Sequence, residues 1–456
     1  MDIAVLLGVL AALFLAIGLT GPLAERLRLP DTVVLAAIGI ALGAGATSLW
    51  LNQEINALNP LALAILQLPI SSEVFLYVFL PTLIFEVALT INLRRMLDDW
   101  VVILCLAVVA VLVATMMIGF ALSQVTTLPV IACLLIGAIV STTDPSAVVS
   151  IFRATPAPQR LARIVEGESL LNDAAAIALF AVFLSDVVLR ADTPDVSAAL
   201  LRFPGLVLMG AAVGVILGRL AVWLMARLNA WPLGQVSVSL AVPYATFLLA
   251  DKVLGASGVV AVVAAGMMVN FAAPGRVSPV GMAQLRAAWG LMAYLAGSLI
   301  FILAALLIPR LAATLRLSDI GLILVVAFTA LIARGVILYG ILPALTLARL
   351  SRRVEHPYRV AILWGGLRGA VTLALALAVT ENIGVPLEVK RMVGVVAVGF
   401  TLFTLLVQGT TLRPLIGWLG LDRLSPIERA LSDQVVAVAL QSVRETVADT
   451  TKSLDL

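Results

Sequence analysis

The amino-acid sequence predicts an all-α polytopic membrane protein with about 13 transmembrane helices. Hydrophobic residues make up 62% of the chain, whereas Asp, Glu, Lys and Arg together make up only 12%. The mean hydropathy of +1.14 lies far above that of a soluble domain. Apolar runs of about 20 residues, the length that a helix needs to cross a bilayer, recur along the whole chain. These observations exclude a soluble globular protein and a disordered one.

Thirteen apolar runs define the expected spanning helices in chain order. They lie near residues 3–20, 31–49, 74–91, 101–122, 130–151, 164–189, 203–225, 235–250, 257–272, 290–308, 319–347, 360–379 and 392–417. The first run has no basic residue before it and no small-residue cleavage site after it, so we expect a retained helix. The run 319–347 is too long for a perpendicular span, so we expect it to tilt or to continue into the cytoplasm.

The basic residues between the runs predict the orientation of the chain in the membrane. An extracytoplasmic N-terminus places roughly twice as many arginines and lysines in cytoplasmic loops as in external loops. This bias predicts a cytoplasmic C-terminus and an odd number of spans. It also accounts for the net charge of +3, which therefore gives no reason to expect a nucleic-acid partner. The short tail beyond the last run contains an amphipathic stretch, 426–447, expected to form a surface helix.

Six of the charged side chains inside these apolar runs carry the functional argument, because a charge there costs roughly 2.5–3.5 kcal/mol on insertion scales. They are Glu86, Asp144, Glu168, Asp173, Arg334 and Arg368. Such residues usually mark a transport path or a fixed ion pair. Four acids against two arginines leave a negative surplus in a region of low dielectric constant. The sequence therefore predicts a site that holds a small cation, protons, or each in turn.

Two runs contain residues that interrupt a helix at the middle of the membrane. In the fifth run Pro145 lacks an N–H group, and its ring disfavours a helical conformation at Asp144. In the twelfth run three glycines surround Arg368 and allow another backbone to approach closely. These glycines are Gly365, Gly366 and Gly369. In a crossing of two broken helices, Asp144 would offset the partial positive charge of helix N-termini and Arg368 the partial negative charge of C-termini.

The positions of the two interruptions predict an inverted repeat. We expect residues 1–189 to form a first six-helix repeat, 203–225 a linking helix, 235–417 an inverted second six-helix repeat, and 418–456 a short cytoplasmic tail. Each interruption falls in the fifth helix of its repeat, and interrupted helices at matching positions point to a midplane transport site. The expected fold is thus two inverted repeats with crossed, interrupted helices.

The sixth run carries the densest polar patch of any span. Helical spacing places Ser169 and Asp173 on one face, with Glu168 and Asn172 on the adjacent stripe. Asp173 can therefore share a cation with the Ser169 hydroxyl and with an exposed carbonyl near Thr143, and such oxygen ligands suit small hard cations. Glu168 needs a basic partner, and Arg334 is the expected one. No obvious basic partner remains for Asp173.

A buried carboxylate of this kind can bind a proton and a cation in competition. Burial raises the pKa of a carboxylate from its usual value of about 4 into the physiological range, and a bound cation lowers it again. One carboxylate then binds either H⁺ or a metal cation but not both, which is the physical basis of exchange. The chain shows no nucleophile–base pair and no cluster of metal ligands, so we do not expect an enzyme or a bound cofactor.

At this point the sequence resembles the electroneutral branch of the sodium/proton exchangers, within the monovalent cation/proton antiporter superfamily. The resemblance covers nearly all of residues 1–417. It rests on the runs 85–89 (FEVAL), 143–145 (TDP), 166–173 (EGESLLND), 333–334 (AR) and 365–370 (GGLRGA). The runs 166–173 and 365–370 are the specific ones. The family usually has glycine where this chain has Val87.

The resemblance implies roles for the matching residues. Asp173 would carry ion and proton, and the Na⁺ site would be completed by Ser169, Asp144 and the main chain of Thr143. Glu86 matches an acid near the ion path of some relatives. Glu168 and Arg334 would form a structural ion pair, Asn172 would order the site, and Arg368 would brace the crossing. An Asn–Asp pair, where electrogenic relatives have two aspartates, implies one proton per cation.

The resemblance also implies a homodimer whose core moves like an elevator against a scaffold within membrane lipid. Glycine ladders on the second span (Gly39, Gly43) and the seventh span (Gly210, Gly214, Gly218) are expected to serve contacts within the protomer more often than between protomers. The short chain and tail suggest a bacterial inner membrane.

The leading hypothesis is a secondary antiporter that exchanges H⁺ for Na⁺ or Li⁺ at one to one. A K⁺/H⁺ antiporter of the same fold is the nearest alternative, because selectivity depends on the size and hydration of the site. A cation-coupled symporter is a more distant one, because few polar groups remain to hold a second solute. A channel would need a continuous polar path, and a sensor would ordinarily bring a signalling domain.

Overall fold

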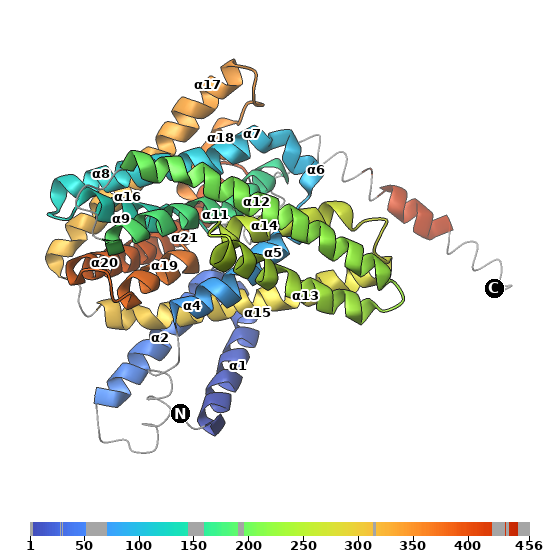
Figure 1. The fold of residues 1–456 in the computed structure, drawn as a ribbon, viewed down its shortest axis with the longest axis horizontal. Helices are drawn as coiled ribbons and strands as arrows, with labels where there is room; N and C mark the ends of the chain where they lie inside the picture. Colours follow the sequence, from blue (N-terminus) through green and yellow to red (C-terminus); the bar gives the residue numbers. More distant parts are fainter. Residues whose placement is uncertain are drawn as a thin grey trace.

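The computed structural model describes residues 3–27, 29, 31–51, 71–144, 159–189, 196–312, 316–421, 434 and 437–445 (Figure 1). All regular secondary structure in these residues is helical. Ten helical stretches among them are long and apolar enough to cross a membrane, and three shorter apolar helices accompany them. Each of the thirteen expected spans coincides with one of these stretches, which confirms the predicted fold class. Within the expected tail helix, residues 437–445 are helical and exposed.

The first six spans comprise α1 (Ile3–Leu27), α2 (Asp31–Leu51), α4 and α5 (Ser72–Val74, Leu80–Thr90), α6, α7 and α8 (Leu93–Met96, Trp100–Leu104, Ala110–Val125), α9 (Val130–Ser141) and α11 (Gln159–Leu189). The seventh to tenth are α12 (Val196–Arg227), α13 (Pro232–Leu248), α14 (Gly258–Ala272) and α15 (Pro279–Ala312). The last three are α16 and α17 (Leu317–Val336, Leu342–Leu347), α18 and α19 (His356–Trp364, Ala370–Glu381), and α20 and α21 (Leu387–Phe403, Gly409–Trp418).

Several spans are continuous helices that contain a π-helical turn. These turns are Phe75–Phe79 between α4 and α5, Cys105–Val109 before α8, Leu249–Val253 after α13, Ile337–Ile341 before α17 and Thr404–Gln408 before α21. Such turns often mark functional positions, because the extra residue shifts the register of the side chains. The helix from Ser72 to Thr90 therefore runs across the molecule as one element.

Buried side chains divide most of the helices into two packed groups. The crossing bundle, named for the two interrupted helices it contains, consists of α8, α9, α11, α16, α19 and α20 around one apolar cluster, which Phe203 of α12 also joins. The flanking bundle consists of the α4–α5 helix with α12, α13, α14 and α15, and it also packs on α11. In Figure 1, α8, α9, α16, α19 and α20 lie toward the left and α13 and α14 toward the right, while α15 runs below both groups. A smaller apolar cluster, contributed by α2, α15, α19 and α20, lies between them.

The glycine ladders serve contacts within the protomer, as expected. A Cβ atom on Gly210, Gly214 or Gly218 of α12 would collide with backbone carbonyl groups at the start of α14 and along it. A Cβ atom on Gly39 or Gly43 of α2 would collide in the same way with α15. Both pairs of helices therefore approach closely because the glycines lack side chains. These ladders therefore give no support for a dimer interface, and the homodimer stays a prediction.

Candidate functional site

Non-helical backbone occurs at both predicted interruptions, as far as the described residues extend. The helix α9 ends at Ser141, and residues 142–144 continue without helical structure; Pro145 lies outside the described residues. In the twelfth span, α18 ends at Trp364 and α19 begins at Ala370, with Gly365, Gly366 and Gly369 in the gap. The crossing bundle thus contains two short stretches of open backbone, which need partners at membrane depth.

The two open stretches satisfy each other's polar groups. The backbone N–H of Asp144 donates to the carbonyl group of Leu367 at 2.8 Å. In the reverse direction, the Arg368 guanidinium donates to the carbonyl group of Thr142. A hydroxyl–hydroxyl hydrogen bond of 2.8 Å joins Thr142 to Thr372. The crossing is therefore held by one backbone contact, one charged contact and one contact between neutral side chains.

Two positions of the second stretch require glycine, because charged side chains from other spans approach their backbone closely. A Cβ atom on Gly369 would collide with the Asp144 carboxylate. A Cβ atom on Gly366 would lie 2.8 Å from the Arg334 guanidinium. The glycines therefore leave room for two charged groups, which is a more specific function than the general loosening of a helix that the sequence indicated.

Arg368 is buried at the crossing and has three kinds of partner. Its guanidinium lies at the C-terminal end of α9, where carbonyl groups carry partial negative charge. Its backbone N–H donates to the hydroxyl of Thr404 at 3.1 Å, and its guanidinium lies 5.1 Å from the ring centroid of Phe400. Sequence reasoning missed Thr372, Thr404 and Phe400. No local pattern in the sequence indicated them, because Arg368 lies in the open stretch before α19 and shares no helical face with these residues.

The polar patch of α11 meets the first open stretch. The hydroxyl of Ser169 donates to the carbonyl group of Thr143 at 3.0 Å. The side-chain amide of Asn172 donates to the hydroxyl of Thr143. Asp173 is half-buried and, among the described residues, has no hydrogen-bond or ion-pair partner. Ser169, Asp173 and Thr143 line the same cavity, and their shared role in binding a cation stays a prediction.

Glu168 and Arg334 form the predicted ion pair, with 2.5 Å between Oε1 and the guanidinium. Glu168 is buried and Arg334 is nearly so. Arg334 comes from α16, so the pair joins two helices of the crossing bundle. Burial of both charges makes each depend on the other, because an isolated buried charge is costly.

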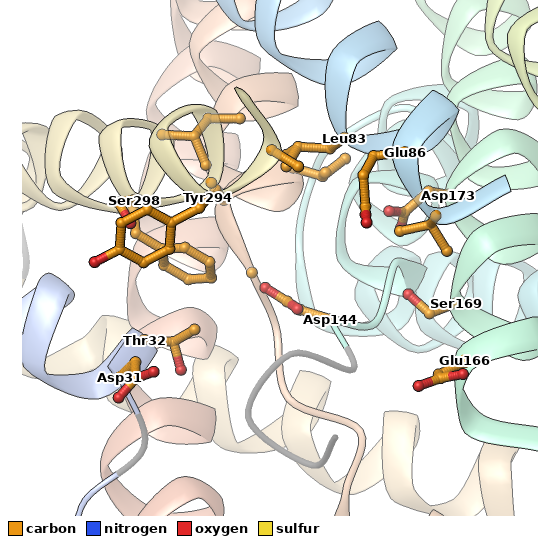
Figure 2. A pocket seen from close by; sticks show the side chains of 18 of the residues that line it. Asp31, Thr32, Leu83, Glu86, Asp144, Glu166, Ser169, Asp173, Tyr294 and Ser298 are labelled. Carbon is orange, nitrogen blue, oxygen red and sulfur yellow. The ribbon is translucent and has the colours of Figure 1, made fainter. Parts of the chain in front are cut away.

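A large cavity of about 1220 Å³ separates the crossing bundle from the flanking bundle and from α1 and α2. Figure 2 shows Asp144, Ser169 and Asp173 of the crossing bundle and Glu86 of α5 pointing into this space. The acids that line it outnumber the arginines: Glu25, Asp31, Glu86, Asp144, Glu166 and Asp173 against Arg163 and Arg413. The Asp144 and Asp173 carboxylates are close enough to repel each other. A surplus of negative charge in a recess concentrates cations there.

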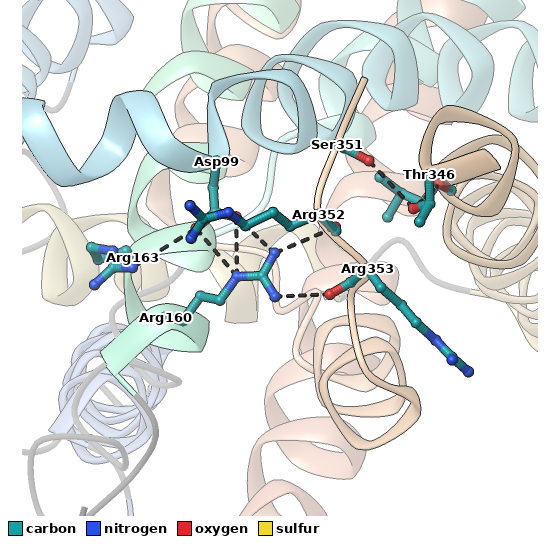
Figure 3. A network of polar contacts seen from close by, with 8 residues as sticks. Asp99, Arg160, Arg163, Thr346, Ser351, Arg352 and Arg353 are labelled. Carbon is teal, nitrogen blue, oxygen red and sulfur yellow. Dashed lines mark hydrogen bonds and ion pairs between the residues drawn. The ribbon is translucent and has the colours of Figure 1, made fainter. Parts of the chain in front are cut away.

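The cavity extends to the end of the molecule where α1 and α5 end and α2 and α11 begin, and this end is called its mouth below. At this end Arg160 of α11 binds Asp99 at 2.7 Å. It also donates to the carbonyl groups of Arg353 at 2.8 Å and Arg352 at 3.4 Å, as Figure 3 shows. Arg163 lies 3.8 Å from Asp99. These contacts fasten the start of the fourth span, α11 and the loop before α18 to one another.

The geometry thus brings together the predicted Asp173, Ser169, Thr143, Asp144 and Glu86 around one cavity. Comparisons with known proteins then identify the family. Residues 9–418 match the profile of the sodium/hydrogen exchanger transmembrane family. The Na⁺/H⁺ antiporter ApNhaP of Aphanothece halophytica is 32% identical over 441 residues, covering 93% of this chain and 79% of that protein. The chain belongs to the sodium/hydrogen exchanger family.

Two further comparisons agree with this assignment. The Na⁺/H⁺ antiporter NhaG of Bacillus atrophaeus is 30% identical over 412 residues, covering 90% of this chain and 74% of that protein. The structure of the sodium proton antiporter MjNhaP1 from Methanocaldococcus jannaschii superposes with a TM-score of 0.70 at 18% identity, over 92% of this exchanger and 99% of that chain. At that identity the superposition shows a shared fold. This exchanger is therefore an integral membrane protein with the sodium/proton antiporter fold.

Proposed function

We propose that this exchanger is a secondary active antiporter that exchanges H⁺ for Na⁺ or Li⁺ at one to one, with Asp173 as the carrier. The observation that carries the proposal is the position of Asp173. It lies in a negatively charged cavity, beside the Ser169 hydroxyl and opposite Asp144. Glu168, five residues earlier, is neutralised by Arg334. The names of the relatives, which are Na⁺/H⁺ antiporters, support the same ions.

Competition at Asp173 would couple the two ions. A cation bound by the carboxylates of Asp173 and Asp144, the Ser169 hydroxyl and the Thr143 main chain would exclude a proton from Asp173. A proton on Asp173 would in turn remove the charge that holds the cation. No covalent chemistry is needed, because each half of the cycle moves one bound ion.

The stoichiometry of one to one rests on Asn172. The amide of Asn172 donates to the Thr143 hydroxyl and so has an ordering contact. Because an amide does not titrate, only one carboxylate of the pair 172–173 is available to exchange an ion. Each direction of transport would then carry one positive charge, and the exchange would be insensitive to membrane voltage.

Alternating access would follow from movement of the crossing bundle against the flanking bundle in a homodimer, within the lipid of a bacterial inner membrane. The cavity extends to the end of the molecule where Arg160, Arg163, Arg352 and Arg353 gather. Positive residues favour the cytoplasmic side. The conformation described here would therefore be open to the cytoplasm, with an extracytoplasmic N-terminus.

Exchange in proteoliposomes that contain a pH-sensitive dye tests this function. A pH gradient is imposed, and Na⁺, Li⁺, K⁺ or choline is added with and without a potassium/valinomycin voltage clamp. We expect Na⁺ or Li⁺ to collapse the gradient at a rate that the clamp does not change. Asp173→Asn should abolish the response, whereas Asp186→Asn, on the same helix and away from the cavity, should not. A response to K⁺ alone, or none to any ion, would overturn the proposal.

A further inference from the structure

The side of the molecule opposite the cavity mouth is closed by a contact between the two bundles. The continuous helix Ser72–Thr90 has its last residue at the mouth of the cavity and its first residue about 27 Å away, at a rise of 1.5 Å per residue. The helix α19 likewise starts at the cavity and runs away from it to Glu381. The far ends of these two helices meet.

Two hydrogen bonds between Ser72 and Glu381 join the two helices at this point. The Glu381 carboxylate accepts from the backbone N–H of Ser72 at 2.9 Å and from the Ser72 hydroxyl at 2.6 Å. Ser72 is the first residue of its helix, so the carboxylate binds an N-terminus where N–H groups lack helical partners. A negative charge is favourable there, and such charge-assisted bonds are strong.

The position of Glu381 within its own helix is unfavourable. It is the last residue of α19, and a negative charge at a helix C-terminus opposes the partial negative charge of the free carbonyl groups. An arginine or lysine would suit this position better in isolation. The carboxylate is therefore explained by its partner on the other bundle and not by its own helix.

Each partner is fastened to its own bundle. On one side, Tyr77, one turn after Ser72, donates to Asp251 at the end of α13 and packs against the Phe247 ring at 5.2 Å. On the other side, Gly384 follows α19 and lies so close to Val188 at the end of α11 that a Cβ would be 2.8 Å from it. The hydrogen bonds between Ser72 and Glu381 consequently join two separately anchored bodies.

We propose that the Ser72–Glu381 contact is the gate contact that closes the transport path on the side opposite the cavity. This inference rests on the proposed alternating access. The contact stabilises the conformation described here, and it must break each time the crossing bundle moves to open the far side. Glu381 thereby sets the balance between the two conformations without touching the transported ion.

Cross-linking tests the requirement that the contact breaks. In a background with Cys105→Ala and Cys133→Ala, Ser72→Cys and Glu381→Cys are joined by a short bis-methanethiosulfonate reagent that a reductant cleaves. We expect exchange to fall about tenfold or more on cross-linking and to recover on reduction. The matched control joins Asp319→Cys to Arg391→Cys, which replaces a 3.1 Å ion pair within the crossing bundle. Cross-linking that control should leave exchange within about twofold.

A second measurement does not depend on transport. Ala374 is a buried residue of α19, and it belongs to the smaller apolar cluster between the two bundles. An impermeant thiol reagent, added from the far side, should label Ala374→Cys about tenfold faster when Glu381→Ala is present, as loss of a charge-assisted hydrogen bond predicts. Glu381→Gln, which keeps an acceptor oxygen, should show a smaller increase.

Two results would overturn the gate. One is full exchange by the cross-linked Ser72→Cys/Glu381→Cys protein, and the other is unchanged labelling of Ala374→Cys in the Glu381→Ala variant. Failure of the proposed function looks different, because unmodified protein would then show no cation-dependent exchange while the labelling result would still report on the gate.

Discussion

Glu168 and Asp173 lie on the same helix, five residues apart, yet their surroundings differ in every respect that matters for ion binding. Glu168 is buried within the crossing bundle and bound to Arg334 at 2.5 Å. Asp173 faces the cavity between the bundles, where acids outnumber arginines, and has no ion-pair partner among the described residues. Two carboxylates of one helix are thus suited to opposite tasks. The partner and the access to water decide the task, not the residue type.

Asp173→Asn should have the largest effect on function. We expect loss of exchange and also loss of the Na⁺-dependent increase in melting temperature that a ligand bound to the folded state produces. Folding should be intact, because the change removes a charge that is repelled by Asp144 and breaks no ion pair. The measurement is thermal unfolding in detergent with and without Na⁺. A variant that still exchanges ions normally would show that Asp173 is not the carrier.

Glu168→Ala should have the largest effect on stability. Removing it leaves the Arg334 charge buried without its partner, at a cost of about 3–5 kcal/mol. Arg334→Ala should cost a similar amount, and the double variant should cost less than the sum of the two single changes. Thermal or denaturant unfolding gives all three values. If Arg334→Ala were as stable as the unchanged protein, the pair would not be the structural element inferred here.

Gly369→Ala should weaken cation binding while leaving most of the fold intact. The added methyl group would collide with the Asp144 carboxylate, so Asp144 must move away from the site that it shares with Asp173. We expect the apparent KM for Na⁺ to rise on the order of tenfold, the change that a 1.4 kcal/mol loss of binding free energy gives. Gly290→Ala provides the matched control, because Gly290 also lines the cavity but has no neighbour within 4 Å of an added Cβ. An unchanged KM in Gly369→Ala would exclude Asp144 from the site.

Thr372→Val should have the smallest effect. It removes the hydroxyl that bonds to Thr142 at the crossing, which is worth about 1 kcal/mol in stability. Thr372→Ser should restore most of this loss, because it keeps the hydroxyl. A double-mutant cycle with Thr142→Val isolates the coupling between the two residues. A coupling energy of zero would show that the hydroxyl pair does not help to hold the crossing.

Most of the fold and the main members of the site could be predicted from the sequence. Hydrophobic run length identifies spanning helices because a bilayer excludes unpaired backbone groups. Charges inside those runs are rare enough to identify Glu168, Asp173 and Arg334 as a set, and the predicted Glu168–Arg334 pair is confirmed. The interruption at 365–369 could be predicted because several glycines next to a charged residue are unusual within a span. The division into two inverted repeats and the homodimer stay predictions.

Other features depend on contacts between segments far apart in the chain, and no local pattern encodes them. Thr404 and Phe400 resemble any other residues of an apolar helix, yet both contact Arg368. Glu381 and Ser72 are 309 residues apart, and nothing near either one indicates the other. The reason for Gly369 was likewise hidden, because the atom it makes room for belongs to Asp144 in another span.

The sequence by itself determined that this protein crosses the membrane many times, where two of its helices break, and which charges cannot be left alone in lipid. Those properties follow from the solvation of backbone and charged groups, which depends on the residues of each segment. Only the tertiary structure decided which carboxylate faces the cavity, which is neutralised, and which joins the two bundles on the far side. These outcomes depend on the packing of whole helices, because the neighbours of a side chain come from segments that local sequence does not specify.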